Sequence, residues 1–214
     1  RSNLAGTRHV LELCRNARIR KFHHVSTAYV AGLRSGRIME SDVDVGQKLS
    51  NDYEQSKLQA EKLVRSAGYL DSLTVHRPAI IIGDSTNGYT TTYHGFYALL
   101  QAVATLAQQF TVDATGHCGV EGTFGVSGRE TKNLVPVDWV SAVMSHVITH
   151  PEHHGKTYHL TPLHPVNSRL LADIFEDAVG FYGVKLDGAG KPMSGLSEYE
   201  QQIGRAHVEL QSLT

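Results

Sequence analysis

The chain carries the stretch Tyr53-Glu-Gln-Ser-Lys57, and an expected strand that ends in Val25-Ser26-Thr27-Ala28 precedes it. A tyrosine and a lysine four residues apart on a helix share one face, so their functional groups can meet at one ligand. A hydroxyl at the end of a neighbouring strand would add a third group. These residues predict a proton-transfer site built from a strand end and a helix.

Helical and strand-like patterns alternate on both sides of this stretch. Apolar residues at three- and four-residue spacing predict helices over residues 3–17, 52–67, 93–110, 139–149 and 168–179. We expect Asp138 and Ser168 to cap the last two of these helices. Short apolar runs predict strands over 22–28, 73–82, 134–137 and 157–161. Helices that alternate with short apolar strands indicate an α/β fold with a parallel sheet.

Two stretches lack either pattern. Residues 116–128 are rich in glycine, and we expect them to be irregular. After Gly180 the content of Gly, Ser and Lys rises, which predicts a disordered tail over 181–214. Within this tail, residues 203–214 resemble a translated sequencing adapter, so we expect that segment to be non-native.

The composition is that of an ordinary soluble protein. The 214 residues are 41% hydrophobic and 19% charged, and the formal net charge is −1. This balance gives no electrostatic reason to expect nucleic acid or an anionic membrane as a partner. No apolar run approaches the roughly 20 residues of a membrane span. Cys14 and Cys118 are far apart and outside any CxxC pattern, so we expect two reduced thiols in a cytoplasmic protein.

The Tyr53 and Lys57 pair lies within a larger set of ordered motifs. The others are Asn3-Leu-Ala-Gly6-Thr7, Ser26-Thr27-Ala28 with Gly32, Arg77-Pro78-Ala79-Ile80-Ile81-Ile82-Gly83 and Asn133-Leu-Val-Pro-Val-Asp138. With this set, residues 2–175 resemble the extended short-chain dehydrogenase/reductase superfamily. Three segments look most like its thioester-reductase and fatty-acyl-CoA-reductase branch: 22–32, 36–40 and 83–85.

The resemblance implies a fold and a division of the chain. The fold is the C-terminal part of a Rossmann-like doubly wound parallel sheet, with part of a small substrate-binding subdomain. Residues 1–180 would then form an incomplete NAD(P)-binding reductase domain, and 181–214 would follow it as the tail.

The resemblance also implies roles for individual residues. It assigns the catalytic roles to Thr27, Tyr53 and Lys57, and it makes Asn3 a weaker candidate for substrate contact beside Thr27. Cofactor contacts would come from Ser26, Tyr53, Lys57, Pro78, Ala79 and Ile80. Relatives in this branch reduce acyl thioesters with NADPH, so NADP is favoured over NAD as cofactor. The partner would be a small-molecule or carrier-bound acyl substrate, and dimerisation of relatives through a helix pair implies a homodimer.

The chemistry of these residue types fits a carbonyl reductase. Hydride transfer to a carbonyl requires a proton for its oxygen, and tyrosine has an ordinary pKa of about 10, so it needs help near neutral pH. The ammonium of Lys57 would favour the phenolate of Tyr53 and could bind ribose hydroxyls of the cofactor. Thr27 would hold the substrate oxygen beside Tyr53.

One family feature is missing from the sequence. No glycine-rich turn between a strand and a helix precedes the site, although such a turn binds the pyrophosphate of a dinucleotide. Gly122-Thr-Phe-Gly125 and Gly188-Ala-Gly-Lys-Pro192 do not replace it, because neither follows a strand and opens a helix. We therefore expect this chain to be the C-terminal part of a longer reductase. Alone it should bind dinucleotide poorly and expose an unpaired strand edge.

Other readings stay open at this point. A nucleotide-sugar epimerase or dehydratase would use the same residues, although Ala31 stands where those enzymes tend to carry tyrosine. A non-catalytic dinucleotide-binding protein is a second alternative. His150, His153 and His154 with Glu152 could bind a metal, but we expect a solvated turn there and no metal site.

Overall fold

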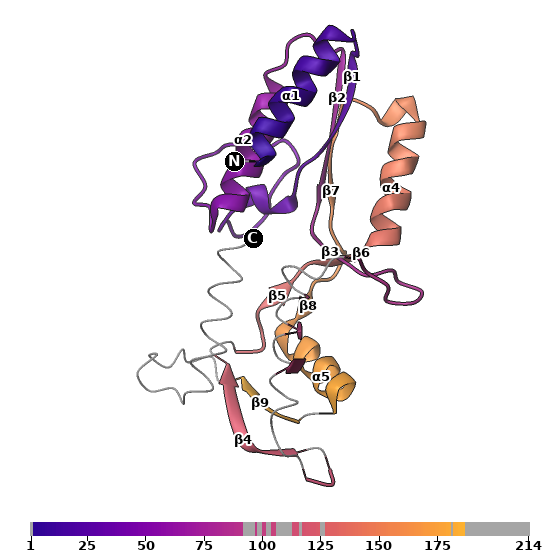
Figure 1. Cartoon of the computed structure of the whole chain (residues 1–214). Helices are drawn as coiled ribbons and strands as arrows, with labels where there is room; N and C mark the ends of the chain where they lie inside the picture. The colour runs from indigo at the N-terminus through magenta and orange to yellow at the C-terminus, as the bar shows by residue number, and fades with distance from the viewer. Residues whose placement is uncertain are drawn as a thin grey trace. The chain divides into compact units, whose positions relative to one another are not determined.

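Figure 1 shows the computed structural model of the chain, which describes residues 2–91, 97, 100–101, 104–105, 113–115, 117–124, 127–180 and 182–186. The chain divides into two compact units. Unit 1 comprises residues 1–90 and 134–163, and unit 2 comprises residues 91–133 and 164–214. The chain therefore leaves unit 1 after Thr90 and returns to it at Leu134.

Unit 1 is built on a parallel sheet of three strands in the order β1-β2-β7. These strands are β1 (Lys21–Val25), β2 (Ser72–Pro78) and β7 (Thr157–Leu160). The register pairs Lys21 with Ser72 and Val25 with His76. The carboxyl ends of β1 and β2 consequently lie at the same edge of the sheet, which is where ligands bind in α/β folds. The predicted strands and the parallel arrangement are confirmed.

Helices cover both faces of this sheet. Figure 1 shows α1 (Ser2–Asn16) and α2 (Asp52–Arg65) on one face and α4 (Val137–Thr149) on the other. Each helix turns an apolar stripe toward the sheet, as its sequence pattern predicts. The buried side chains of these stripes are Leu11, Cys14, Leu58, Val64, Val140 and Val147. Unit 1 is thus a three-layer α/β structure of Rossmann-like type, which confirms the predicted fold class.

The strand predicted over 73–82 is interrupted at Ala79. Its second part forms β3 (Ile80–Ile82), which pairs in parallel with β6 (Leu134–Pro136). The break occurs because the amide of Ala79 donates to the carbonyl of Leu160 (3.0 Å), after which the chain exchanges β7 for β6 as its partner. The buried cluster under α4 lies at this exchange and consists of Ala79, Val135, Val140 and Leu160.

Two predicted helix caps are wrong. α4 begins at Val137 with Pro136 at the cap position, so Asp138 lies in the first turn, where its carboxylate accepts from the amide (2.9 Å) and the hydroxyl (2.7 Å) of Ser85 and ties that loop to the helix. At α5 (Ser168–Val179) the cap is Asn167, whose side chain accepts from the amide of Leu170 (2.7 Å). The hydroxyl of Ser168 donates instead to the backbone carbonyl of Glu130 (3.0 Å).

Within its described residues, unit 2 contains α5 and two pairs of strands. β4 (His117–Phe124) pairs in parallel with β9 (Tyr182–Leu186), and β5 (Thr131–Lys132) pairs antiparallel with β8 (Val166–Asn167). The expectations of irregular structure over 117–124 and of disorder over 182–186 are therefore wrong. Each of these segments finds its partner strand far away in the sequence, which local composition cannot reveal. The predicted helix over 93–110 lies largely, and the tail over 187–214 entirely, outside the described residues.

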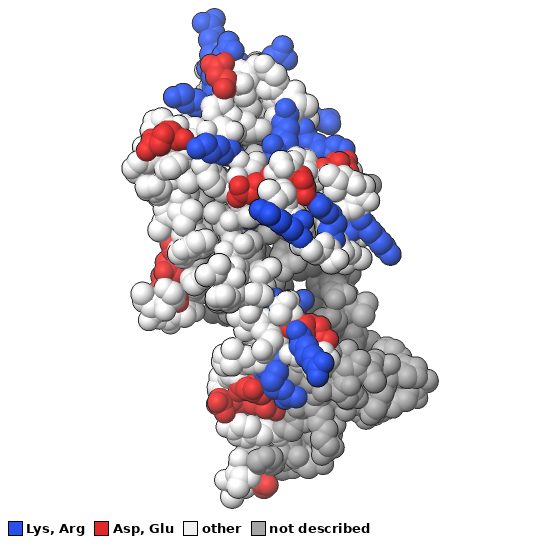
Figure 2. Space-filling model, turned by 180° about the vertical axis from the view of Figure 1, so that it is seen from behind, with Lys and Arg blue, Asp and Glu red and all other residues white. Residues whose placement is uncertain are grey.

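Charged side chains of both signs are interspersed on the face of the molecule shown in Figure 2. Over the described residues of that face, no extended field of one sign is visible, in keeping with the net charge of −1. Among the helices that the structure describes, none is both long enough and apolar enough to cross a bilayer.

Candidate active site

Thr27 lies where the chain leaves β1. The amide of Ser26 still donates to the carbonyl of His76 (2.7 Å), and Thr27 then caps a short 3₁₀ helix, η1 (Ala28–Ala31). The buried Thr27 hydroxyl accepts from the amide of Tyr29 (3.2 Å) and donates to the carbonyl of Pro78 (3.3 Å). Thr27 is thereby held between the carboxyl ends of β1 and β2.

Tyr53 and Lys57 reach the same edge of the sheet from α2. Tyr53 is 38% exposed, and the side chain of Thr27 is close enough to lower the pKa of its phenol. The ammonium of Lys57, one turn further along the helix, donates to the carbonyl of Val25 at the end of β1 (2.7 Å). The spacing of Tyr53 and Lys57 therefore does place both side chains on one face of α2, next to Thr27.

The surroundings shift the pKa values of both groups. Burial raises the pKa of the Tyr53 phenol, the hydrogen bond with Thr27 lowers it, and the nearby charge of Glu54 raises it. Burial lowers the pKa of Lys57, while the negative charge of Glu61 raises it. A raised pKa leaves Tyr53 protonated near neutral pH but makes its phenol a weaker acid, so the help expected from Lys57 is not expressed as a lowered pKa of Tyr53 in this structure.

Asn3 is linked to this site through one intermediate residue. Its side-chain amide donates to the hydroxyl of Ser56 (3.1 Å), and that hydroxyl donates to the carbonyl of Tyr53 (2.9 Å). The beginning of α1 is therefore adjacent to the turn of α2 that carries Tyr53. A direct contact between Asn3 and a substrate stays a prediction.

Not all of the residues predicted to contact a cofactor lie together at the site. The carbonyl of Pro78 binds Thr27, and the buried Ala79 and the half-buried Ile80 follow it directly at the end of β2, beside the three catalytic candidates. Ser26 differs, because its buried hydroxyl donates to the carboxylate of Glu61 (2.6 Å). The structure thus does not bring the Ser26 hydroxyl together with Tyr53 and Lys57.

A buried charge pair that the sequence did not lead us to expect lies beneath the site. Glu61 is 0% and Arg77 is 1% exposed at the side chain, and their closest approach is 2.6 Å. Two signals could have revealed the pair. Glu61 continues the Tyr53 and Lys57 spacing by one more turn, and Arg77 interrupts a strand whose other side chains are mostly apolar. An arginine within a buried strand requires a carboxylate nearby.

The exposed groups at this edge fit one part of a dinucleotide. Lys57 and Tyr53 offer a cation and a hydroxyl, which suit ribose hydroxyls and a nicotinamide ring placed over the ends of β1 and β2. A pyrophosphate requires a glycine-rich turn at a helix start. Gly122 does not supply it, because it lies within β4, and Gly125 lies outside the described residues. The glycines at 188 and 190 lie outside the described residues.

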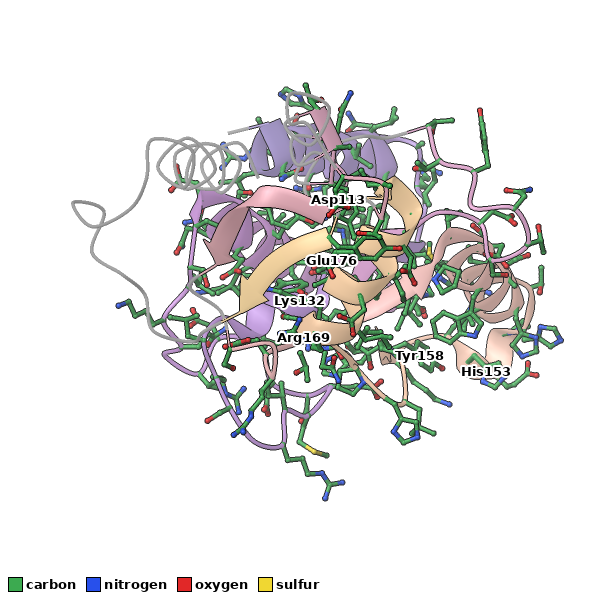
Figure 3. The ribbon with its side chains drawn as sticks, turned by 90° about the horizontal axis from the view of Figure 1, so that it is seen from below. Asp113, Lys132, His153, Tyr158, Arg169 and Glu176 are labelled. Atoms are coloured by element: carbon green, nitrogen blue, oxygen red, sulfur yellow. The ribbon has the colours of Figure 1, made fainter. Side chains whose placement is uncertain are left out.

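The histidines near residue 150 form ring contacts with one another. The rings of His146 and His150 are stacked with centroids 4.0 Å apart, and the ring of His153 lies 5.3 Å from that of His146. Tyr158 of β7 donates its hydroxyl to the carbonyl of His153 (2.8 Å), and both residues are labelled in Figure 3. In the part of the chain that the structure describes, no group of three or more His, Cys, Asp or Glu side chains could hold a metal ion.

Comparison with known proteins matches the region of the chain that contains these motifs. Residues 1–144 match the family described as "Male sterility protein", an NAD-binding family. The chain is 26% identical to the nonribosomal peptide synthetase asaC of Aspergillus flavus, over 77% of this chain and 16% of that protein. It is 25% identical to the aldehyde reductase lnaA of the same species, over 97% of this chain and 19% of that protein. The chain thus spans a fifth or less of the length of these relatives.

A solved structure agrees with this assignment. The terminal R domain from the myxalamid PKS-NRPS biosynthetic pathway superimposes with a TM-score of 0.70 at 26% identity. The similarity covers 96% of this chain and 50% of that one. Two thirds of the chain match one family, and the described fold and the order of the motifs fit the same superfamily. The chain belongs to the male sterility protein family, within the extended short-chain dehydrogenase/reductase superfamily.

Proposed function

We propose that this chain carries the proton-transfer residues of an NAD(P)-dependent reductase that acts on an acyl thioester. The convergence of Thr27, Tyr53 and Lys57 at the carboxyl ends of β1 and β2 is the main support. Similarity to a peptide synthetase, to an aldehyde reductase and to a terminal R domain adds to it. These names favour an acyl group bound to a carrier as the substrate, and the resemblance to NADPH-dependent relatives favours NADP.

In this proposal each residue acts on the thioester oxygen. A bound NADPH would supply the hydride to the carbonyl carbon. Thr27 orients the carbonyl oxygen, for which its hydroxyl must turn away from the carbonyl of Pro78. Tyr53 gives its proton to that oxygen, which yields a thiohemiacetal. The C–S bond of this intermediate then breaks as its hydroxyl loses the proton, so that the aldehyde forms and the carrier leaves as the free thiol. The cation of Lys57 stabilises the phenolate that remains, and its bond to Val25 fixes its place.

The first test is the substitution Tyr53→Phe in the complete protein, assayed with a synthetic acyl-pantetheine thioester and NADPH. Positioned proton transfer contributes about 10²–10⁴-fold to a rate, so we expect kcat to fall by about that factor. The loss of NADPH absorbance and the appearance of aldehyde measure the rate. UDP-sugars, tested in parallel, should give no turnover.

Tyr158→Phe is the matched control, because it also removes one tyrosine hydroxyl. That hydroxyl donates to the carbonyl of His153 and takes no part in the site. The control should keep near-normal turnover. Near-normal turnover in Tyr53→Phe would exclude Tyr53 as the proton donor.

A further inference from the structure

The helix that carries Tyr53 and Lys57 has a third polar residue in the same line. Tyr53, Lys57 and Glu61 are spaced by four residues each and therefore lie on one face of α2. Tyr53 and Lys57 are accessible, but the side chain of Glu61 is completely buried. The chemistry proposed above does not use Glu61, so its position needs a separate explanation.

The carboxylate of Glu61 is fully engaged. One oxygen accepts from the hydroxyl of Ser26 (2.6 Å) and from Nε of Arg77 (3.1 Å). The other accepts from the guanidinium groups of Arg77 (2.6 Å) and Arg65 (2.7 Å). Burial alone would raise the pKa of Glu61, but these hydrogen bonds and the charge of Arg77 hold it at about 2. Glu61 is therefore a permanent anion with two strong links to the sheet.

Ser26 and Arg77, which bind Glu61 from the sheet, are each adjacent in sequence to a residue that fixes the position of Thr27. Ser26 immediately precedes Thr27, and Arg77 immediately precedes Pro78, whose carbonyl accepts the Thr27 hydrogen bond. A movement of Glu61 would therefore shift both supports of Thr27 relative to α2. Arg77 also donates to a carbonyl of the loop before α2, that of Asp42 (2.8 Å), so this loop is fixed by the same network.

We propose that Glu61 is a positioning residue, which sets the place of Tyr53 and Lys57 relative to Thr27 through its bonds to Ser26 and Arg77. The inference rests on the proposed function for the roles of Thr27, Tyr53 and Lys57. It differs from a purely structural role because buried ion pairs contribute little net stability, whereas a small displacement of a catalytic group is costly.

The kinetic test compares Ser26→Ala with Arg65→Gln in the complete protein. Both variants remove hydrogen bonds from Glu61, but only Ser26→Ala breaks the link to the residue before Thr27. We expect kcat to fall at least about 10-fold in Ser26→Ala with KM and the Kd for NADPH changed less than about twofold, since a 1 Å misplacement can cost 10²-fold. Arg65→Gln should keep kcat within about twofold of the wild type.

Two kinetic results would overturn the proposal. Equal effects on kcat in the two variants would show that Glu61 acts only through stability. A rise in the Kd for NADPH that accounts for the loss in Ser26→Ala would make Ser26 a cofactor contact instead.

A second measurement does not depend on turnover. In NMR spectra of this chain, the nuclear Overhauser effect between the Thr27 methyl group and the Tyr53 ring should weaken in Ser26→Ala and Glu61→Gln, and persist in Arg65→Gln. The pKa of Lys57 should fall in Glu61→Gln, because the negative charge that raises it is gone. Unchanged contacts and an unchanged Lys57 pKa in Glu61→Gln would overturn the proposal. Absent turnover in the wild type, or full activity in Tyr53→Phe, would instead refute the proposed function, and the NMR contacts would then test only whether Glu61 holds Tyr53 and Lys57 in place relative to Thr27.

Discussion

His24 is a buried histidine on β1 whose surroundings disfavour its charged form. It is 8% exposed, and its Nε2 atom has no hydrogen-bond partner among the described residues. Burial, together with the cations of Lys57 and Arg65 and against the opposing charge of Glu61, lowers the pKa of His24 from 6.5 to about 4. The folded chain therefore keeps His24 neutral over a pH range in which the unfolded chain protonates it.

This difference predicts an acid-sensitive fold. Because the unfolded chain binds a proton at His24 more readily than the folded chain does, the free energy of unfolding is highest above pH 6.5 and declines as the pH falls from 6.5 toward 4. At about 1.4 kcal/mol for each pKa unit, His24 alone would remove up to roughly 3 kcal/mol from the free energy of unfolding. Urea denaturation at several pH values measures it. In His24→Leu the decline should be shallower, with a remainder from His23, His76 and His159, whose pKa values burial also lowers.

An exposed histidine provides the control for this prediction. His9→Leu on α1 removes an imidazole from the surface and should leave the pH dependence as in the wild type. Identical declines in His24→Leu and the wild type would contradict the assignment to His24.

Among single residues, those whose positions follow from local spacing could be predicted from the sequence. Tyr53 and Lys57 meet because they are four apart on a helix, and Thr27 joins them because it ends a strand. The bond between Glu61 and Arg77 could not be predicted in the same way. It depends on how α2 lies across β2, and no local pattern contains that information.

The first turn of α2 presents Tyr53, so the capping of this helix bears directly on the site. The side chain of Asn51 accepts from the amide of Glu54 (2.9 Å), and the carboxylate of Glu54 accepts in return from the amide of Ser50 (2.7 Å). This reciprocal arrangement satisfies amides that have no partner within the helix.

We expect Asn51→Ala to loosen the turn that carries Tyr53. Loss of an asparagine cap costs about 1 kcal/mol, and the exposed amides of the first turn should exchange with deuterium faster. Hydrogen exchange followed by mass spectrometry measures this locally. Asn167→Ala is the matched control, because Asn167 caps α5 through the same kind of bond to the amide of Leu170. It should accelerate exchange in α5 and leave the first turn of α2 unchanged, and equal exchange in α2 of both variants would contradict the prediction.

The positions of the helices and strands were easier to predict from the sequence than the segments with which they pair. The helices α1, α2, α4 and α5 and the strands β1, β2, β6 and β7 follow apolar spacing in their own sequence. The break at Ala79 and the strand β4 do not, because each reflects pairing with a distant segment. The misassigned cap at Asp138 has the same cause, since Ser85 competes for its carboxylate.

For the whole molecule, the absence of a glycine-rich turn in the sequence before the site predicts weak cofactor binding by this chain alone. Hydrogen bonds to a charged group contribute about 1.5–3 kcal/mol each, so losing two backbone contacts to the pyrophosphate weakens binding by at least about 10²-fold. Isothermal titration calorimetry with NADPH measures this against the complete protein. Lys57→Met should reduce the residual affinity further. Tight binding by the purified chain alone would refute this prediction.

The pairing of β3 with β6 has a consequence for how such a chain can diverge. Ile80 and Leu134 are neighbours in unit 1, although residues 91–133 between them belong to unit 2. Because the pairing of β3 with β6 holds the ends of this segment together, doubling the length of the segment costs only about 0.6 kcal/mol of loop-closure entropy. Insertions and deletions can therefore accumulate between β3 and β6 over evolutionary time, while α2, β1 and β2 keep their alignment. Homologues should accordingly vary most in length within the segment that corresponds to residues 91–133 and least between Thr27 and Arg77.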